Sequence, residues 1–250
     1  MFIDTHCHLN YEYDDCVDDV IKRAQDVGVG ALVCATANPD DITTVMDIAK
    51  NHDNIFVTIG IHPEYINSNP NDYVKLLNNP RVVGVGEIGL DYHDGAQNRK
   101  QQIELFEKQL EIARANNLPV AIHTRDAESD TAAILTDKYR GVMHCFTSSW
   151  DLAKVMLDRG FYFSASGILT FKNAESVRET FAKIPNDRIV IETDAPYCAP
   201  VPYRGKQCES SMIIETAKVL ATIKNLQIND LEDILYENTK RLYPKCHVKL

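Results

Sequence analysis

Apolar runs of strand length recur along the whole chain. They cover residues 2–8, 31–35, 55–60, 82–87, 119–123, 142–145, 161–165 and 189–194. Few of these runs alternate apolar and polar side chains, which is typical of a parallel sheet that is covered on both faces. The pattern therefore predicts eight buried strands.

Stretches with a helical period separate most of these runs. The clearest is residues 97–116, where Ile103, Phe106, Leu110 and Ala113 recur at helical spacing with charged residues between them. Further helices are predicted over residues 15–26, 40–50, 127–138, 149–159, 173–182, 209–224 and 229–242. Residues 195–205 are rich in Pro, Gly and Tyr and predict a long loop after the eighth strand.

This alternation of strands and helices predicts an α/β fold, a (β/α)8 barrel of the TIM type. A doubly wound open sheet would suit the same alternation. No linker, low-complexity segment or repeat divides the 250 residues, so residues 1–250 are expected to form a single domain. The two folds differ in one respect: a barrel gathers the C-terminal ends of all eight strands around one mouth.

Charge and cysteine content narrow the class of protein. The net charge of −10 disfavours a broad grip on duplex nucleic acid, because such binding needs a large positive face. The seven cysteines are an odd number without C-x-x-C spacing, which indicates reduced thiols in the cytosol. Neither a signal peptide nor a run of membrane-spanning length is visible. We expect a cytoplasmic, monomeric protein without a membrane partner.

Residues that ligate metals gather at the predicted strand ends. Five of the eight histidines lie there, with one carboxylate ending the fourth strand and one ending the eighth: His6, His8, His62, His123, His144, Glu87 and Asp194. Side chains alternate along a strand, so Asp4, His6 and His8 are expected to share one face. A barrel would bring all the strand ends to one rim.

Such a rim would supply four histidines and two carboxylates to two divalent ions, with one carboxylate spanning both. Two ions about 3.5–4 Å apart can hold a hydroxide and stabilise both oxygens of a displacement. The alternative is a satisfied polar network at the rim, which is disfavoured because unpaired buried carboxylates are costly. Histidine ligands favour zinc or manganese, while carboxylates and phosphate chemistry would also suit magnesium.

Residues 84–89 read G-V-G-E-I-G and match the G-x-G-x-x-G dinucleotide fingerprint. That motif must open a helix directly, so that the pyrophosphate sits on the helix N-terminus. Here six further residues precede any helical pattern, and Glu87 would repel phosphate unless a cation covered it. We therefore expect no nucleotide cofactor.

Several cations and aromatic residues adjoin the predicted rim. Arg125 follows His123 by two residues, and Lys172, Arg204 and Lys206 lie in loops after the seventh and eighth strands. Singly, such cations are usually solvated, but together at one mouth they would suit phosphates. Aromatic residues near the ligands could stack on bases or simply pack: Phe146, Tyr197 and Tyr203. We expect the two cysteines next to ligand histidines, Cys7 and Cys145, to point into the core.

Six segments carry a resemblance to a known family. They are residues 4–9 (DTHCHL), 60–63 (GIHP), 86–92 (GEIGLDY), 122–127 (IHTRDA), 144–147 (HCFT) and 192–197 (ETDAPY). In this order they resemble the successive signatures of the TatD family of metal-dependent deoxyribonucleases. The resemblance implies a barrel of the amidohydrolase type and hydrolysis of phosphodiesters.

The resemblance also implies roles for individual residues. One metal ion would be held by His6, His8 and Asp194, the other by His123 and His144, and Glu87 would bridge them. His62 and Arg125 would face the scissile phosphate and its neighbours, and Arg204 would also contact the substrate. The catalytic residues would then be Asp194, Glu87 and His62.

Two rim segments depart from the family's pattern. Residues 207–210 read Q-C-E-S where the family usually has R-N-E-P, and residues 146–149 read F-T-S-S instead of F-T-G-S. Neither segment contains an expected ligand, so the departures bear on substrate preference more than on the metal site.

The function expected from the sequence is metal-dependent hydrolysis of DNA, through a metal-activated water, at single-stranded ends. One alternative keeps the metals and changes the bond to an amide or ester, in a small molecule or one linked to tRNA. A second alternative is a metal-stabilised scaffold without catalysis, which would need a closed coordination shell.

Overall fold

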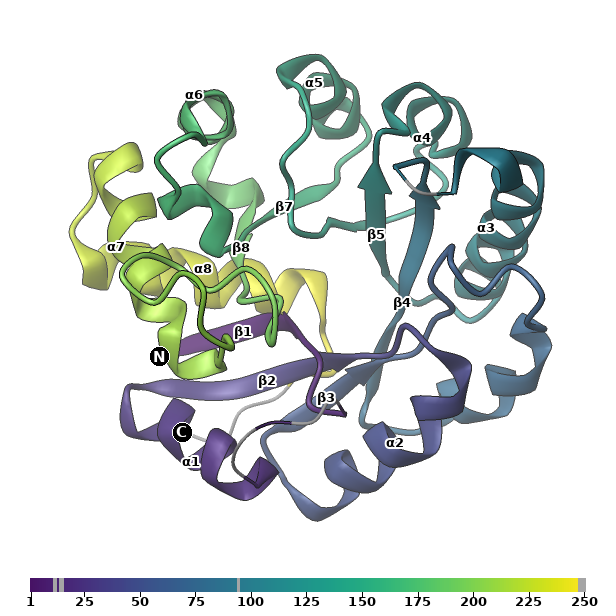
Figure 1. Ribbon diagram of the computed structural model, residues 1–250, viewed down its shortest axis with the longest axis horizontal. Helices are drawn as coiled ribbons and strands as arrows, with labels where there is room; N and C mark the ends of the chain where they lie inside the picture. Colours follow the sequence, from purple (N-terminus) through teal and green to yellow (C-terminus); the bar gives the residue numbers. More distant parts are fainter. Residues whose placement is uncertain (11–12, 14–15, 94, 247–250) are drawn as a thin grey trace.

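The computed structural model describes residues 1–10, 13, 16–93 and 95–246. Within these ranges, eight parallel strands form one sheet in chain order, each hydrogen-bonded to the next, and helices surround it (Figure 1). The strands are β1 (Phe2–Cys7), β2 (Val29–Ala35), β3 (Ile55–Thr58), β4 (Val82–Asp91), β5 (Val120–Arg125), β6 (Gly141–Met143), β7 (Tyr162–Ala165) and β8 (Ile189–Ile191). The predicted (β/α)8 barrel is confirmed, and the open doubly wound sheet is wrong.

Eight α-helices are present in the described ranges, one near each predicted position. They are α1 (Val17–Asp26), α2 (Ile42–Asn51), α3 (Arg99–Ala115), α4 (Glu128–Ile134), α5 (Trp150–Asp158), α6 (Glu175–Lys183), α7 (Ile213–Lys224) and α8 (Ile228–Leu242). Residue 15, where the first helix was expected to begin, lies outside the described residues. None of the described helices is both long and apolar enough to cross a lipid bilayer.

The connection between β3 and β4 differs from the others. It holds η2 (Pro70–Asn78), a 3-10 helix, in place of an α-helix, and the sequence pattern predicted no helix there. Its N-terminus is capped by Asn69, whose side chain accepts a hydrogen bond from the backbone N–H of Asn71. Tyr73 and Leu77 are its large buried side chains, and η2 packs against β4.

The apolar interior has two parts. Residues between the strands and the surrounding helices form the outer layer, to which α3 contributes Leu105, Phe106, Leu110 and Ala113. A second cluster takes at least one residue from every strand, so it fills the inside of the barrel. We call this inner cluster the floor; it consists of Ile3, Ala31, Val33, Phe56, Val83, Ala121, Val142, Tyr162, Val190, Leu242, Tyr243 and Cys246.

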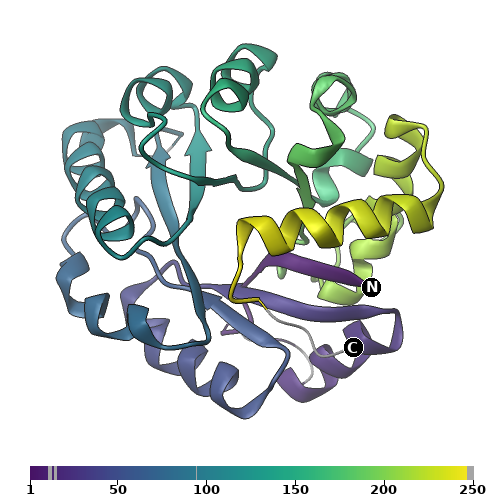
Figure 2. The same cartoon turned by 180° about the vertical axis from the view of Figure 1, so that it is seen from behind.

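The floor is closed by the C-terminal helix. Viewed from behind, α8 crosses the barrel next to β1 (Figure 2). Tyr243 follows α8 directly and is fully buried among the inward-facing residues of the strands. Lys245 then donates a hydrogen bond to the carbonyl oxygen of Val82 at the start of β4. The N-terminal end of the barrel is therefore packed and apolar, and the opposite end remains for a site.

The seam between the first and last strands is joined sparsely. No ladder connects β1 to β8 in the described residues; one isolated bridge pairs Cys7 with Ala195. The fully buried Asp4 makes up for part of this, because its carboxylate accepts hydrogen bonds from the backbone N–H and the hydroxyl of Thr193, at 3.0 and 2.6 Å. Burial raises the pKa of Asp4 to about 7.

Asp4 does not join the histidines as the alternation had predicted. The pairing of β1 with β2 shifts register between Asp4 and Cys7, so the simple two-residue period does not hold across this stretch. His6 and His8 point into the barrel mouth while the Asp4 carboxylate faces Thr193 in the seam. Asp4 is therefore a residue of the seam.

The three glycines of the G-x-G-x-x-G match lie inside β4, with no helix following directly. Gly89 has φ +149°, and a Cβ there would overlap the carbonyl oxygen of His123 on β5. A Cβ at Gly86 would lie 2.6 Å from the Cβ of Ala121. These glycines thus allow β4 and β5 to approach closely where both carry site residues.

Candidate metal centre

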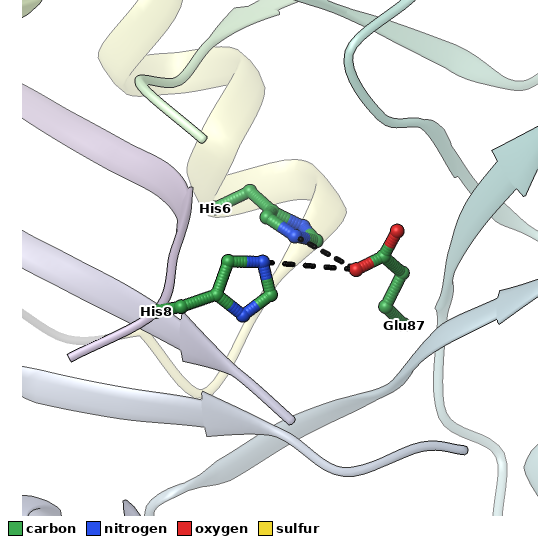
Figure 3. A group of neighbouring side chains, drawn as sticks. All are labelled: His6, His8 and Glu87. Atoms are coloured by element: carbon green, nitrogen blue, oxygen red, sulfur yellow. Dashed lines mark ion pairs between the residues drawn. The ribbon is translucent and has the colours of Figure 1, made fainter. Parts of the chain in front are cut away.

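Glu87 on β4 lies at the centre of the barrel mouth, and its two carboxylate oxygens face different histidines. Oε2 is 3.5 Å from His6 Nε2 and 3.7 Å from His8 Nε2 (Figure 3). Oε1 is 2.8 Å from both His123 Nδ1 and His144 Nε2. One carboxylate therefore separates two pairs of imidazole nitrogens.

Asp194 completes the first of these groups. Its Oδ1 lies 3.8 Å from His6 Nε2 and 3.6 Å from His8 Nε2. The residue follows β8 and has a left-handed backbone (φ 59°), a conformation that Asp tolerates better than most residues. Its N–H donates to the carbonyl oxygen of His6, and its own carbonyl accepts from the N–H of Tyr197. These bonds fix the turn that aims the carboxylate at the two histidines.

Hydrogen bonds on the outer side of the rings set which nitrogen faces Glu87. The Nδ1 of His8 donates to the carbonyl oxygen of Ala35 at 3.0 Å, which turns Nε2 toward Glu87 and Asp194. The Nε2 of His123 donates to the Asp91 carboxylate at 2.9 Å, which turns Nδ1 toward Glu87. A cation that displaces the proton from either inward nitrogen would therefore meet a lone pair that already points at it.

His144 and His6 differ in their outer contacts. The Nδ1 of His144 lies 3.3 Å from Oε1 of Glu192, which also accepts a 2.6 Å bond from the N–H of Cys145. Neither ring nitrogen of His6 makes a hydrogen bond to any described residue, although its side chain is only 1% exposed. Buried polar atoms without a hydrogen-bond partner are rare and costly, so we expect the His6 ring to bind a ligand.

The electrostatics of the centre also favour a bound cation. Burial raises the pKa of Glu87, but His144, His123 and His6 outweigh it and hold the pKa well below its usual value. Burial lowers the pKa of His144, yet Glu87 and Glu192 raise it well above normal. Burial and the neighbouring His144 lower the pKa of His6. Without a metal, a proton on His144 offsets the negative charge of Glu87 and Glu192. A divalent ion could supply that positive charge instead.

The residues present fit divalent cations. Among the groups of ligand atoms that lie close enough together to hold an ion, two share Glu87: one is formed by His6, His8 and Glu87 and the other by Glu87, His123 and His144. Asp194 adds a further oxygen to the first group. Nitrogen and carboxylate donors in this proportion suit zinc, manganese or similar ions.

A cavity of about 570 Å³ opens from this centre to the surface. Its walls include Glu87, His123 and Asp194 together with Arg125, whose side chain is exposed. Tyr197 lies on the wall with 51% of its surface exposed. The ligands are therefore reachable by a molecule much larger than water.

His62 and Arg125 both lie where the sequence placed them, on the cavity wall. The Nε2 of His62 is 3.8 Å from Oε1 of Glu87, and its ring lies edge-on to that of His123 with centroids 4.5 Å apart. Arg125 ends β5 and pairs in register with Asp91 of β4. Both side chains can reach a molecule bound over Glu87.

Arg204 lies elsewhere. Its guanidinium stacks over the ring of Phe171, 4.2 Å from the centroid, and it is not one of the described residues that line the cavity. Phe146 is buried against Phe163, so of the three aromatic candidates Tyr197 alone borders the cavity.

Cys145 corrects a prediction. We expected its side chain in the core, but the residue has φ 40° and lines the cavity. The left-handed backbone breaks the strand alternation just after His144 and turns the thiol toward the mouth. Cys7, by contrast, is fully buried in the outer core layer as expected.

Asp91 and Glu192 were not among the predicted site residues. The sequence pattern ends the fourth strand at Glu87, yet β4 continues to Asp91, whose carboxylate orients His123. Glu192 supports His144 from the residue after β8. A carboxylate near a ligand histidine on a neighbouring strand is the signal that could have identified both.

A (β/α)8 barrel whose mouth gathers these histidines and carboxylates is the architecture of a metal-dependent hydrolase. The family described as "TatD related DNase" matches residues 3–244, and the chain belongs to this TatD family.

Relatives support the same class. The chain is 39% identical to the "uncharacterized metal-dependent hydrolase YabD" of Bacillus subtilis (strain 168), over 97% of this chain and 99% of that protein. It is 37% identical to YcfH of Escherichia coli (strain K12), also named an uncharacterized metal-dependent hydrolase, over 96% and 95%. The crystal structure of YJJV, a TatD homolog from Escherichia coli K12, matches with a TM-score of 0.88 at 26% identity, over 97% of this chain and 98% of that one.

Proposed function

We propose that this metal-dependent hydrolase cleaves phosphodiester bonds in DNA and trims single-stranded ends, using two divalent ions. The observation that carries the proposal is the divided carboxylate of Glu87, which faces His6 and His8 with one oxygen and His123 and His144 with the other. A carboxylate in this position can hold two cations side by side. The family description, "TatD related DNase", supports DNA as the substrate.

When bound, the two ions would lower the pKa of a water molecule and offset the charge that develops on the phosphate. Asp194 borders the cavity next to His6 and His8, so its carboxylate is placed to orient that water and accept its proton. Burial raises the pKa of Asp194, but His8, His144 and His6 outweigh it and lower the pKa. The residue is therefore ionised at neutral pH, as a proton acceptor must be.

His62 and Arg125 would contact the phosphate. His62 follows β3, Arg125 ends β5, and both line the cavity. Among the described residues that line it, Arg125 is the sole Lys or Arg. A guanidinium at this place would stabilise the extra negative charge of the transition state. It also offsets the repulsion between a phosphate and the acidic residues of the mouth.

Tyr197 gives a reason to favour a single strand. Its exposed ring on the cavity wall lies 6.3 Å, centroid to centroid, from the ring of His8. A base stacked on that ring would place the adjacent phosphate near the ligands, and every base offers a face for stacking. A duplex would need a broad positive surface instead, which a protein of net charge −10 does not provide.

The test is release of nucleotides from end-labelled single-stranded DNA, with and without EDTA, followed by add-back of magnesium, manganese or zinc. Asp194→Asn should remove most of the activity, whereas Asp158→Asn, a change at an exposed helix position, should not. The same preparations are assayed on RNA, duplex DNA, and amide and ester substrates. Turnover of amides or esters without cleavage of DNA would replace the proposed substrate. Metal-dependent stability without turnover of any substrate would indicate a scaffold.

A further inference from the structure

A second kind of ligand cluster adjoins the histidine centre. The thiols of Cys145 and Cys198 and a carboxylate oxygen of Asp194 all lie within 4.8 Å of one another. The thiol of Cys198 is 3.5 Å from Oδ2 of Asp194. Both cysteines line the cavity, whereas Cys7, Cys34 and Cys208 are fully buried in the core. The two thiols can thus be reached by an ion that enters the cavity.

Asp194 divides its oxygens between two environments, as Glu87 does. Its Oδ1 faces His6 and His8, at 3.8 and 3.6 Å, while its Oδ2 faces Cys198. The same carboxylate can therefore serve a cation at the histidines and another at the thiols without changing its position.

The surroundings hold both cysteines in place. The N–H of Cys145 donates to the buried Glu192 at 2.6 Å, and its thiol lies 3.2 Å from the hydroxyl of Ser166. Cys198 follows the turn in which the N–H of Tyr197 bonds to the carbonyl oxygen of Asp194 at 2.8 Å. The two thiols come from segments that follow β6 and β8, and these contacts bring them to one wall.

We propose that Cys145, Cys198 and Asp194 form a third cation site, specific for a thiophilic divalent ion such as Zn²⁺ or Cd²⁺. Thiolates bind such ions far more strongly than they bind Mg²⁺ or Mn²⁺, which prefer oxygen ligands. Each thiol forms a sulfur–metal bond and releases its proton to solvent, and the Ser166 hydroxyl can then donate to the Cys145 sulfur. Three protein ligands leave a fourth position open toward the cavity.

A third site of this kind predicts that the protein binds more zinc ions than manganese ions per chain. Protein stripped with chelator, kept under reducing agent and then loaded with Zn²⁺ should retain one ion more per chain than the same protein loaded with Mn²⁺. Cys198→Ser and Cys145→Ser should each lose that one Zn²⁺ and leave the Mn²⁺ content unchanged. Cys16→Ser is the matched control, because Cys16 is an exposed thiol bonded to Asp19. Elemental analysis after gel filtration gives the counts.

A second measurement needs no variant. Cd²⁺ added to the wild-type protein should produce the ultraviolet charge-transfer band of cadmium thiolates and should protect Cys198 from alkylation, as mapped by mass spectrometry. Circular dichroism and melting temperature establish that each variant is folded. Equal zinc and manganese counts in wild type, zinc retained in both variants, or no cadmium–thiolate band would each overturn the site. These readouts do not involve DNA, so they stand apart from failure of the nuclease proposal.

Discussion

The two ends of the barrel are formed by the same eight strands but differ in the side chains that they bury. The floor packs apolar side chains such as Ile3, Phe56 and Tyr162 against Tyr243, all nearly or fully buried. The mouth holds buried imidazoles and carboxylates, among them His6, whose ring nitrogens make no hydrogen bond within the described part of the chain. The floor holds no buried cluster of imidazoles and carboxylates among its described residues, whereas the mouth becomes complete when positive charge is bound.

This difference indicates that the floor contributes mainly to the stability of the fold and the mouth mainly to metal binding. Burial of apolar surface at the floor favours folding in any condition of salt or metal. Buried polar atoms at the mouth oppose folding until ligands satisfy them. Substitutions at the two ends should therefore give separable results, one set in unfolding experiments and the other in metal binding.

The largest effect is expected for Glu87→Gln. An amide has a single neutral oxygen, so it cannot face both histidine pairs with negative charge. Changes at outer partners of metal ligands typically cost about 10–100-fold in affinity, and loss of a central ligand should exceed about 100-fold in metal affinity and in turnover. Metal titration with steady-state kinetics measures both. Glu104→Gln, on the exposed face of α3, is the control. Unchanged metal content in Glu87→Gln would show that this carboxylate is no ligand.

Tyr243 provides the corresponding test of the floor. Tyr243→Ala leaves a cavity under the strands and should lower the free energy of unfolding by about 3–5 kcal/mol in urea denaturation. Tyr243→Phe should leave it unchanged or raise it by about 1 kcal/mol, because the buried hydroxyl makes no hydrogen bond to any described residue. Neither variant should change the metal content of folded protein. An equal loss of stability in both would mean that the hydroxyl has a partner.

Asp91→Asn should affect one half of the mouth. The carboxylate accepts a hydrogen bond from Nε2 of His123 at 2.9 Å and so directs Nδ1 toward Glu87. Without its charge, affinity for the ion at His123 and His144 should fall by about 10–100-fold, while the ion at His6 and His8 stays. Isothermal titration resolves the two sites. Asp126→Asn, which perturbs the exposed His93 instead, is the matched change. Equal weakening of both ions would contradict the division of the mouth into halves.

A smaller effect is expected from pH. Burial lowers the pKa of His8, but Asp194 and Glu87 outweigh it and raise the pKa to about 9. A cation needs the neutral ring, so below pH 9 binding must first displace this proton. Affinity for the ion at His6 and His8 should fall by up to about tenfold per pH unit as pH decreases below 9, and should level off above it. Titrations between pH 6 and 10 measure this, and a flat profile would count against it.

The fold could be predicted from the sequence because every strand is a compact apolar run, and several of these runs end in a polar residue or are followed by one. The same feature located the ligands: His123 and His144 end or follow such runs, and the barrel then brings them within 2.8 Å of Glu87. No separate knowledge of contacts was needed, since the fold itself defines which end of each strand faces the mouth.

The residues that escaped prediction are those at which the backbone departs from a regular strand. Cys145 has a left-handed φ, and Asp4 lies at a shift of register, so in both cases the two-residue period gives the wrong direction. Asp91 was missed because the apolar run predicted a strand over residues 82–87, whereas β4 continues to Asp91. Such departures arise from tertiary contacts between strands and leave little trace in local composition.

The sparse seam between the first and last strands acquires a second meaning once the ligands are considered. His6 and His8 come from β1, and Asp194 follows β8, so an ion held by these three residues would tie together the two edges that hydrogen bonds join least. Chelation should then loosen the molecule locally, with amide hydrogens of β1 and β8 exchanging earlier than those of β4 and β5. In that case the cation would reversibly stabilise the closure of the barrel, in addition to taking part in catalysis.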